Sequence, residues 1–191
     1  QVLPFSTGVI GEHLPVGRIT AALPNLVAGL DPDGWPRAAR AIMTTDTVPK
    51  LVSRQFQVAG RIATLTGMAK GAGMICPDLA TLLAFLATDA AVDPTLLQRS
   101  LEDAVNASFN AITVDGDTST NDACVLAASG ALGNPLIMDA EGADGAAFRS
   151  ALEALCLDLA TAIVRDAEGA TKLVRVAVEG ALDRAEARRV A

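Results

Sequence analysis

Apolar residues recur at helical spacing in four stretches of the chain, which predict helices at residues 16–30, 34–43, 94–109 and 146–166. The third of these follows Asp93, whose carboxylate suits a helix N-cap, and Pro94 suits the first helical turn. Two runs rich in alanine and leucine predict further helices, at residues 81–91 and 122–131.

Strands are indicated where apolar and polar residues alternate. Residues 52–69 alternate on both sides of Ala59-Gly60, which predicts a β-hairpin. Residues 171–181 predict a closing strand, and shorter strands are expected within residues 2–15 and 110–114. This mixture of hairpins and helices favours a layered α+β fold over a doubly wound parallel sheet.

Composition narrows the fold class and the kinds of partner. Hydrophobic residues make up 51% of the chain but aromatic residues only 3%, so the core must consist mainly of Ala, Val, Leu and Ile. The 191 residues are enough for one domain with a sizeable core or for two small domains. A net charge of −7 argues against nucleic acid or an anionic membrane surface as a partner. No unbroken apolar segment reaches the length of a membrane span.

The cysteines and the histidine limit the chemistry. Cys76, Cys124 and Cys156 are widely spaced, which is typical of reduced thiols in a cytoplasmic protein rather than of disulfides or a zinc site. His13 is the sole histidine, so a Ser-His-Asp or Cys-His arrangement would need it as the base. The chain starts at Gln1 in an apolar run and stops without a closing loop, so we interpret it as an internal segment of a larger protein.

The segment KGAGMICPDLATLLAF contains a threonine with two interpretations. Asp78 could cap a helix after Pro77, with Thr81 a tolerated first-turn residue. Alternatively, the Thr81 hydroxyl attacks the Ala80 carbonyl, an ester forms, and hydrolysis frees an α-amine on Thr81. That amine has an ordinary pKa near 8 and can act as general base for the adjacent hydroxyl, so no histidine is needed.

Three other motifs also carry alternatives. In FSTGVIG, the Thr7 hydroxyl and nearby backbone N–H groups form either an ordinary turn or an oxyanion hole. The acidic GDTSTND segment resembles a divalent-ion loop but lacks the EF-hand spacing, so we interpret it as a capped turn and expect no metal. In AEGATKLV, Glu168 either follows a helix end or binds a substrate ammonium group.

The segments STGVIG, MTTDTVPK, KGAGMICPDLATLLAFLATDA, FNAITVDGDTSTNDA and EGATKLV occur in this order. Together they resemble the glutamate N-acetyltransferase/ornithine acetyltransferase family of arginine biosynthesis. The resemblance runs from Leu3 to about Ala181 and implies an αββα sandwich related to the N-terminal-nucleophile hydrolases. Family members are longer than this chain, so we expect both ends to be missing here.

The resemblance also implies roles for individual residues. It implies autocatalytic cleavage between Ala80 and Thr81 within one structural domain, so that residues 1–80 end the α chain and residues 81–191 begin the β chain. Thr81 is then the nucleophile. The other expected site residues are the oxyanion-hole pair Thr7 and Gly8 and the substrate contacts Thr47 (with Thr44 and Thr45 as alternatives), Lys70 and Glu168.

The implied reaction is a ping-pong acetyl transfer. N-acetylornithine acetylates Thr81, ornithine leaves, and glutamate takes the acetyl group. No cofactor is expected, although acetyl-CoA is a second donor in many members. The α and β chains are expected to associate as a cytoplasmic heterotetramer, with no nucleic acid or membrane partner.

The chain departs from the family where Asp78-Leu79 stands in place of the usual Asn-Met, which adds a charge near the cleavage point. The expected C-terminal truncation would also remove substrate-binding residues. Two alternatives therefore remain: a related self-processing aminopeptidase, and an inactive fragment or binding module.

Overall fold

The computed structural model describes residues 3, 5–9, 11–76, 82–118 and 121–191 of the chain. The predicted nucleophile Thr81 and its neighbour Ala80 lie outside the described residues. In chain order, the elements are α1 (Val16–Ala28), η1 (Pro32–Gly34), α2 (Trp35–Ala41), β1 (Lys50–Val58), β2 (Arg61–Lys70), β3 (Leu83–Thr88), α3 (Pro94–Ala107), η2 (Phe109–Ala111), β4 (Ala123–Ala128), α4 (Ala143–Arg165) and α5 (Arg184–Val190).

The strands form one mixed sheet in the order β1-β2-β3-β4, antiparallel except for the parallel pair β3 and β4. The predicted hairpin is confirmed as β1 and β2. Its turn has Ala59 at φ 47° and Gly60 at φ 75°. Positive φ at both positions gives a turn whose twist matches that of the paired strands.

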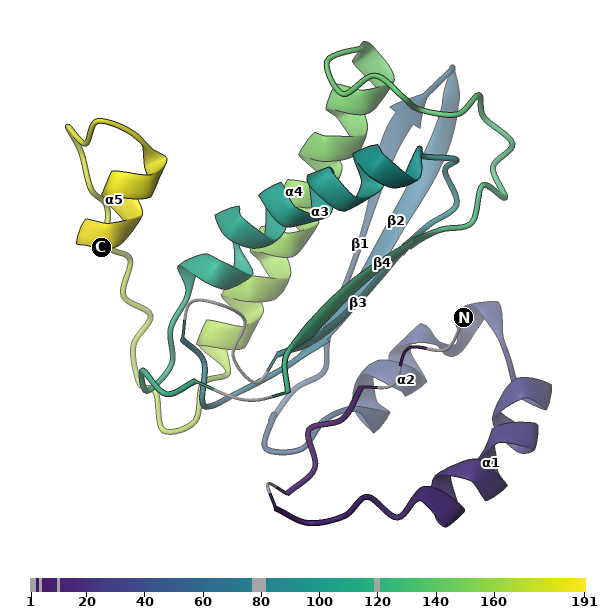
Figure 1. The fold of residues 1–191 in the computed structure, drawn as a ribbon, viewed down its shortest axis with the longest axis vertical. Coiled ribbons are helices and arrows are strands. Elements are labelled where there is room, and N and C mark those ends of the chain that lie inside the picture. Colours follow the sequence, from purple (N-terminus) through teal and green to yellow (C-terminus); the bar gives the residue numbers. More distant parts are fainter. Residues whose placement is uncertain (1–2, 4, 10, 77–81, 119–120) are drawn as a thin grey trace.

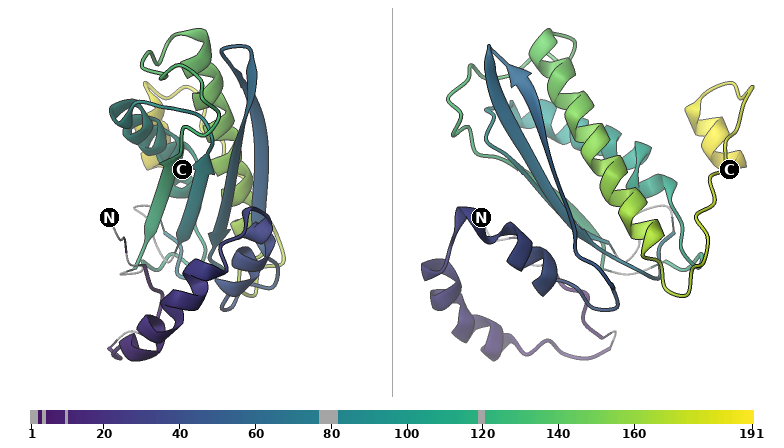
Figure 2. Two further views of the ribbon diagram at one scale, coloured as in Figure 1. Left: turned by 90° about the vertical axis from the view of Figure 1, so that its right-hand side faces the viewer. Right: turned by 180° about the vertical axis from the view of Figure 1, so that it is seen from behind.

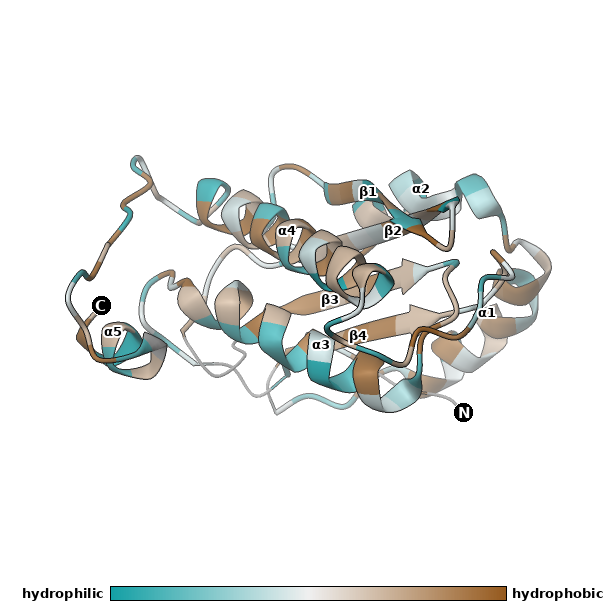
Figure 3. Ribbon diagram, turned by 90° about the horizontal axis from the view of Figure 1, so that it is seen from above, coloured by the Kyte–Doolittle hydropathy of each residue, from teal (hydrophilic) through white to brown (hydrophobic). Residues whose placement is uncertain are grey.

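The long helices α3 and α4 lie together along one face of the sheet (Figures 1 and 3). α4 contacts β1 and β2, while α3 contacts α4 and β4. At the opposite ends of the molecule, α1 and α2 lie beside one end of the sheet and α5 lies apart (Figure 2). The described fold is therefore mixed α+β, with one helical layer on one four-stranded sheet.

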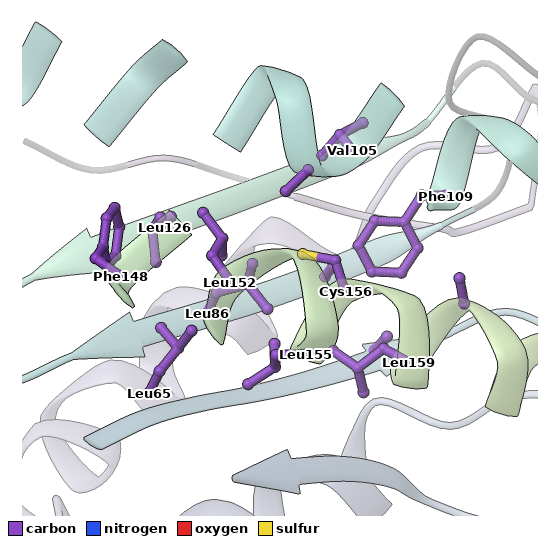
Figure 4. Close-up of a cluster of buried hydrophobic side chains, with 14 of the residues drawn as sticks. Leu65, Leu86, Val105, Phe109, Leu126, Phe148, Leu152, Leu155, Cys156 and Leu159 are labelled. Carbon is purple, nitrogen blue, oxygen red and sulfur yellow. The ribbon is translucent and has the colours of Figure 1, made fainter. Parts of the chain in front are cut away.

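The core fills the space between α4 and the sheet (Figure 4). Leu152, Leu155 and Leu159 are fully buried along α4 and face Leu65 and Leu86. This core is aliphatic with few rings, as the composition predicted. Gly67 in β2 allows the close approach of α4, because a Cβ there would lie 2.8 Å from Leu155 Cδ2.

The other face of the sheet carries a row of apolar side chains. Strand register places Leu51, Met68, Phe85 and Val125 side by side across all four strands. They alternate with the core-facing residues and are only partly buried. Within the described chain, the Phe5 ring packs against the Phe85 ring at 5.7 Å between centroids.

Most helix predictions are confirmed, but both runs rich in alanine and leucine are strands. Residues 83–88 form β3 rather than part of a helix, and residues 123–128 form β4. Each run is short and nearly all apolar, so periodicity does not distinguish a strand from a helix there. The apolar pattern is continuous because one set of β3 and β4 side chains faces the helical layer and the other set belongs to the apolar row on the opposite face.

Other strand predictions are wrong for lack of pairing. Residues 171–179 are irregular, and Val174 and Val176 are 75% and 62% exposed. An alternating segment needs a neighbouring strand to satisfy its backbone groups, and the described residues provide none for it. The described residues from 3 to 15 form no strand either, and Val114 makes only an isolated bridge with Ile75. Among the described helices, none is long and apolar enough to cross a membrane.

The core accounts for a first prediction. Leu155→Ala should lower the free energy of unfolding by about 2–5 kcal/mol, because it leaves a cavity between α4 and the sheet. Leu157→Ala is the matched control on the same helix, since Leu157 is 55% exposed. Chemical denaturation measures both changes. Equal losses for the two variants would contradict the placement of α4.

Candidate functional site

Lys70 ends β2 and is almost fully buried, with 3% exposure. Its ammonium group donates to Thr44 Oγ1 at 2.7 Å and to Thr7 Oγ1 at 3.3 Å. Burial lowers the pKa of Lys70, a nearby Asp46 opposes that change, and Lys50 adds to it. The structure thus brings two residues expected in the site, Thr7 and Lys70, into direct contact.

A buried carboxylate lies immediately behind Lys70. Asp46 accepts hydrogen bonds from the Gly71 amide at 2.9 Å, the Thr44 amide at 3.3 Å and Lys50 Nζ at 2.6 Å. Burial by itself would raise the pKa of Asp46, but the bonds from Gly71 and Lys50 outweigh it and lower the pKa. Asp46 is therefore an ionised carboxylate with its acceptor capacity used on the loop around Lys70.

Lys50 joins this loop to the end of α4. Its ammonium is 2.6 Å from Asp46 Oδ1 and 2.6 Å from Asp166 Oδ2, and the side chains of Lys50 and Asp46 are each 1% exposed. Asp166 also accepts from the Thr47 amide at 2.9 Å and from the Thr47 hydroxyl. Burial alone would raise the pKa of Asp166, but the bonds from Lys50 and Thr47 lower it to about 2. We call Asp46, Lys50 and Asp166 the ion cluster.

Glu168 lies two residues beyond the ion cluster. Its backbone amide donates to the Ala72 carbonyl at 2.8 Å, which fixes it beside the glycine loop after Lys70. Its carboxylate lies over Gly73, where an added Cβ would be 3.3 Å from Glu168 Oε2 and 3.4 Å from Asp115 Oδ2. Gly73 therefore leaves room for two carboxylates, and the exposed side chain of Glu168 can reach a ligand.

The predicted oxyanion-hole residues differ in their bonding. Thr7 accepts from Lys70, so its own hydroxyl proton stays available for donation. The Gly8 amide instead donates to Ser6 Oγ at 3.1 Å. The role of this pair in holding an oxyanion stays a prediction.

Strand register brings the start of β3 to the same end of the sheet. Leu83 is paired with Lys70 on one side and with Ala123 on the other. The Leu82 amide donates to Asp122 Oδ1 at 2.7 Å. Among the described residues, Asp122 Oδ2 is buried without a hydrogen-bond partner, and burial raises the pKa of Asp122 to about 6. The start of β3 therefore lies beside Lys70, and Leu82 bonds to a carboxyl group whose second oxygen has no partner in the described part of the chain.

The threonines of MTTDTVPK have distinct partners. The Thr44 hydroxyl accepts a hydrogen bond from the Lys70 ammonium. Thr47 bonds instead to Asp166, so among the described residues it is connected to Lys70 only through the ion cluster. Glu168 bonds directly to the loop after Lys70, whereas Thr47 is joined to that loop through the ion cluster. Their action on a substrate stays a prediction.

Other sequence-based candidates lie outside this arrangement. The described residues hold no group of three His, Cys, Asp or Glu residues that could bind a metal ion. Cys76, Cys124 and Cys156 are free thiols, and burial raises the pKa of Cys124 to about 12.

Sequence motifs did not indicate Asp46, Lys50 or Asp166 as site residues, and they indicated Asp122 only as part of the acidic GDTSTND turn. Asp46 and Lys50 are four residues apart in the threonine-rich link, and that spacing was the only available signal. Asp166 follows a helix end and pairs with Lys50 across 116 positions, which no local pattern indicates.

The fold and the site define a mixed α+β protein with a buried lysine–threonine–carboxylate site at one end of its sheet. The family model described as the ArgJ family matches residues 1–191. The chain therefore belongs to the ArgJ family.

Individual relatives agree with this assignment. The chain is 59% identical over 190 residues to the "Arginine biosynthesis bifunctional protein ArgJ" of Methylococcus capsulatus, which covers 100% of this chain and 46% of that protein. The protein with the same name from Pseudomonas fluorescens is 54% identical, over 94% of this chain and 44% of its own length. The chain thus spans less than half the length of these curated relatives.

A solved structure of "Arginine biosynthesis bifunctional protein argJ" from Bacillus halodurans is also similar in sequence. It shares 51% identity over 44% of this chain and 39% of its own, with a TM-score of 0.42.

The ion cluster yields a second prediction. The pKa of Asp166 is lower in the folded state than in the unfolded chain, so its contribution to stability is complete above about pH 4 and is lost as pH falls toward 2. At pH 7, Asp166→Asn should lower the free energy of unfolding by about 2 kcal/mol. The difference in the free energy of unfolding between Asp166→Asn and wild type should shrink as the pH falls from 5 to 2.

Denaturant titrations across this pH range measure the effect. Asp158→Asn is the matched control, because Asp158 is 43% exposed in its pair with Arg54 and should contribute less than about 1 kcal/mol. If the free energies of unfolding of wild type and Asp166→Asn differ by the same amount from pH 5 to pH 2, Asp166 is not held as an ion by Lys50.

Proposed function

We propose that this chain carries the acetyl-transfer centre of a glutamate N-acetyltransferase/ornithine acetyltransferase. The observation that supports this most directly is the contact of buried Lys70 with Thr7 and Thr44, in a chain that matches the ArgJ family over its whole length. Relatives covering nearly all of the chain are named as bifunctional proteins of arginine biosynthesis.

The proposed reaction uses Thr81 as a nucleophile. Its Oγ attacks the acetyl carbonyl of N-acetylornithine, the C–N bond breaks, and the hydroxyl proton passes to the departing ornithine amine. The amine of glutamate then attacks the acetyl ester, and the proton returns to Thr81 as N-acetylglutamate leaves. Cleavage before Thr81 frees an α-amine beside the hydroxyl, which supplies the base for both steps. Acetyl-CoA would serve as donor by the same ester, with the thiol as leaving group.

Lys70 and Glu168 would recognise the charged ends of the amino-acid substrates. A buried ammonium that bonds only to hydroxyl groups among the described residues gains from an incoming carboxylate, because a buried charge is costly without an ionic partner. Glu168 has an exposed carboxylate near Gly73 and would bind a substrate ammonium.

Thr7 and Gly8 would stabilise the negative oxygen of the tetrahedral intermediate. The Thr7 hydroxyl accepts from Lys70 and has its proton to give, which strengthens it as a donor. The Gly8 amide would exchange its bond to Ser6 for one to the oxyanion. Loss of one such donor raises the barrier by roughly 3 kcal/mol.

The proposal extends to the whole protein. Cleavage would divide one structural domain into an α chain ending with residues 1–80 and a β chain beginning with residues 81–191, and the two would stay associated, as a heterotetramer in the cytoplasm. A second sheet, from polypeptide beyond residue 191, would cover the apolar row of Leu51, Met68, Phe85 and Val125 and complete an αββα sandwich.

The nucleophile is tested by mass spectrometry together with acetyl transfer. The full-length polypeptide that contains residues 1–191 should separate into two chains before Thr81, and Thr81→Ala should abolish both the break and transfer from N-acetylornithine to glutamate. Thr81→Ser is the control that keeps a hydroxyl and should retain part of both activities. An unbroken wild-type chain with full transfer activity would contradict the mechanism. Release of free amino acids from peptides without acetyl transfer would instead support an aminopeptidase.

The second sheet is tested by placing a charge on the open face. Val125→Asp should lower the free energy of unfolding of the full-length polypeptide by more than about 2 kcal/mol, because it buries a carboxylate between the sheets. The same change in a chain that ends at residue 191 should cost less than about 1 kcal/mol. Gln57→Asp is the control, on the same face but exposed on the edge strand. Equal losses from Val125→Asp in both chains would exclude a covering sheet.

A further inference from the structure

The carboxylate of Asp46 accepts hydrogen bonds from two segments that contact or adjoin Lys70. It accepts from the amide of Gly71, the residue that follows Lys70, at 2.9 Å. It also accepts from the amide of Thr44, at 3.3 Å, and Thr44 Oγ1 is in turn the nearer acceptor of the Lys70 ammonium. A single buried side chain therefore fixes both the backbone of Lys70 and the hydroxyl to which it bonds.

The charges of the buried groups explain why this carboxylate matters. Among the described residues, the charged groups that act on the Lys70 ammonium are Asp46, which favours its charge, and Lys50, which opposes it. Lys50 is in turn neutralised by Asp46 and Asp166. The two lysines and two aspartates sum to zero net charge, so removing Asp46 leaves an excess positive charge in a buried site.

We propose that Asp46 is a positioning residue of the acetyl-transfer site, which holds Lys70 and Gly71 in the arrangement that binds the carboxylate of an amino-acid substrate. This inference rests on the proposed function and assigns Asp46 no contact with the substrate. Lys50 and Asp166 support it, because they fix Asp46 from behind and tie Thr47 and the segment before Glu168 to the same point.

The proposal predicts a specific change in pH dependence. Without the negative charge of Asp46, Lys70 loses its proton at lower pH and with it the capacity to bind a carboxylate. In the full-length polypeptide, Asp46→Asn should therefore raise the KM for glutamate and move the high-pH limb of kcat/KM downward by about one pH unit. The limb at lower pH, set by the amine of the nucleophile, should stay in place.

Two variants separate positioning from general damage to the fold. Asp46→Glu restores the charge and should return the high-pH limb toward wild type, even where the longer side chain lowers activity. Asp158→Asn removes a carboxylate from the surface pair with Arg54 and should leave the profile unchanged. A loss of activity in Asp46→Asn by the same factor at every pH, with unchanged KM, would overturn the proposal.

An NMR titration makes the test independent of turnover. With 15N-labelled lysine, the Lys70 ammonium signal is assigned by its absence in Lys70→Arg, and its pKa is compared between wild type and Asp46→Asn. The proposal requires a lower pKa in Asp46→Asn and a shift of the wild-type signal on adding glutamate; an unchanged pKa or no response to glutamate would overturn it. If the Lys70 pKa is lower in Asp46→Asn and the wild-type signal responds to glutamate, but the wild type transfers no acetyl group, the proposed function is contradicted while the role of Asp46 is supported.

Discussion

The interaction on which the site depends is the pairing of one buried ammonium with two carboxylates. Lys50 begins β1 and lies 2.6 Å from both Asp46 and Asp166. Asp166 directly follows α4. Such a pairing adds little net stability, because dehydrating the ions offsets much of their attraction. What it provides is a fixed geometry. Loss of either carboxylate leaves buried charge uncompensated. The start of β1 and the chain after α4 are therefore strongly held in this arrangement.

The topology of the sheet explains why this geometry reaches the other functional groups. β1 and β2 are antiparallel, so the first residue of one and the last residue of the other, Lys50 and Lys70, come to the same end of the hairpin. β3 begins at that end too, because Leu83 pairs with Lys70. α4 also ends there and delivers Asp166 and then Glu168. The start of β1, the end of β2, the start of β3 and the segment after α4 thereby come together at one glycine loop.

The sequence was sufficient for the long amphipathic helices and for the hairpin, since periodicity and turn residues are local properties. It failed for β3 and β4, whose short apolar runs fit either a strand or a buried helix until their neighbours are known. Residues 171–179 show the reverse failure, because alternation without a partner strand gives no sheet. For the site, ordered motifs indicated Thr7, Lys70 and Glu168, but Asp46 and Asp166 required the fold. Asp46 is only four residues from Lys50, but the pairing of Lys50 with Asp166 joins positions 116 residues apart, and no spacing in the sequence encodes it.

The central claim is that Lys70, held by the ion cluster and the hydroxyls of Thr7 and Thr44, receives the carboxylate of an amino-acid substrate. The most direct measurement is a crystal structure of the full-length polypeptide with N-acetylglutamate bound. The account predicts a ligand carboxylate within hydrogen-bonding distance of Lys70 Nζ, with Asp46, Lys50 and Asp166 in their present contacts. A ligand bound away from Lys70, or an ion cluster rearranged around it, would contradict the account.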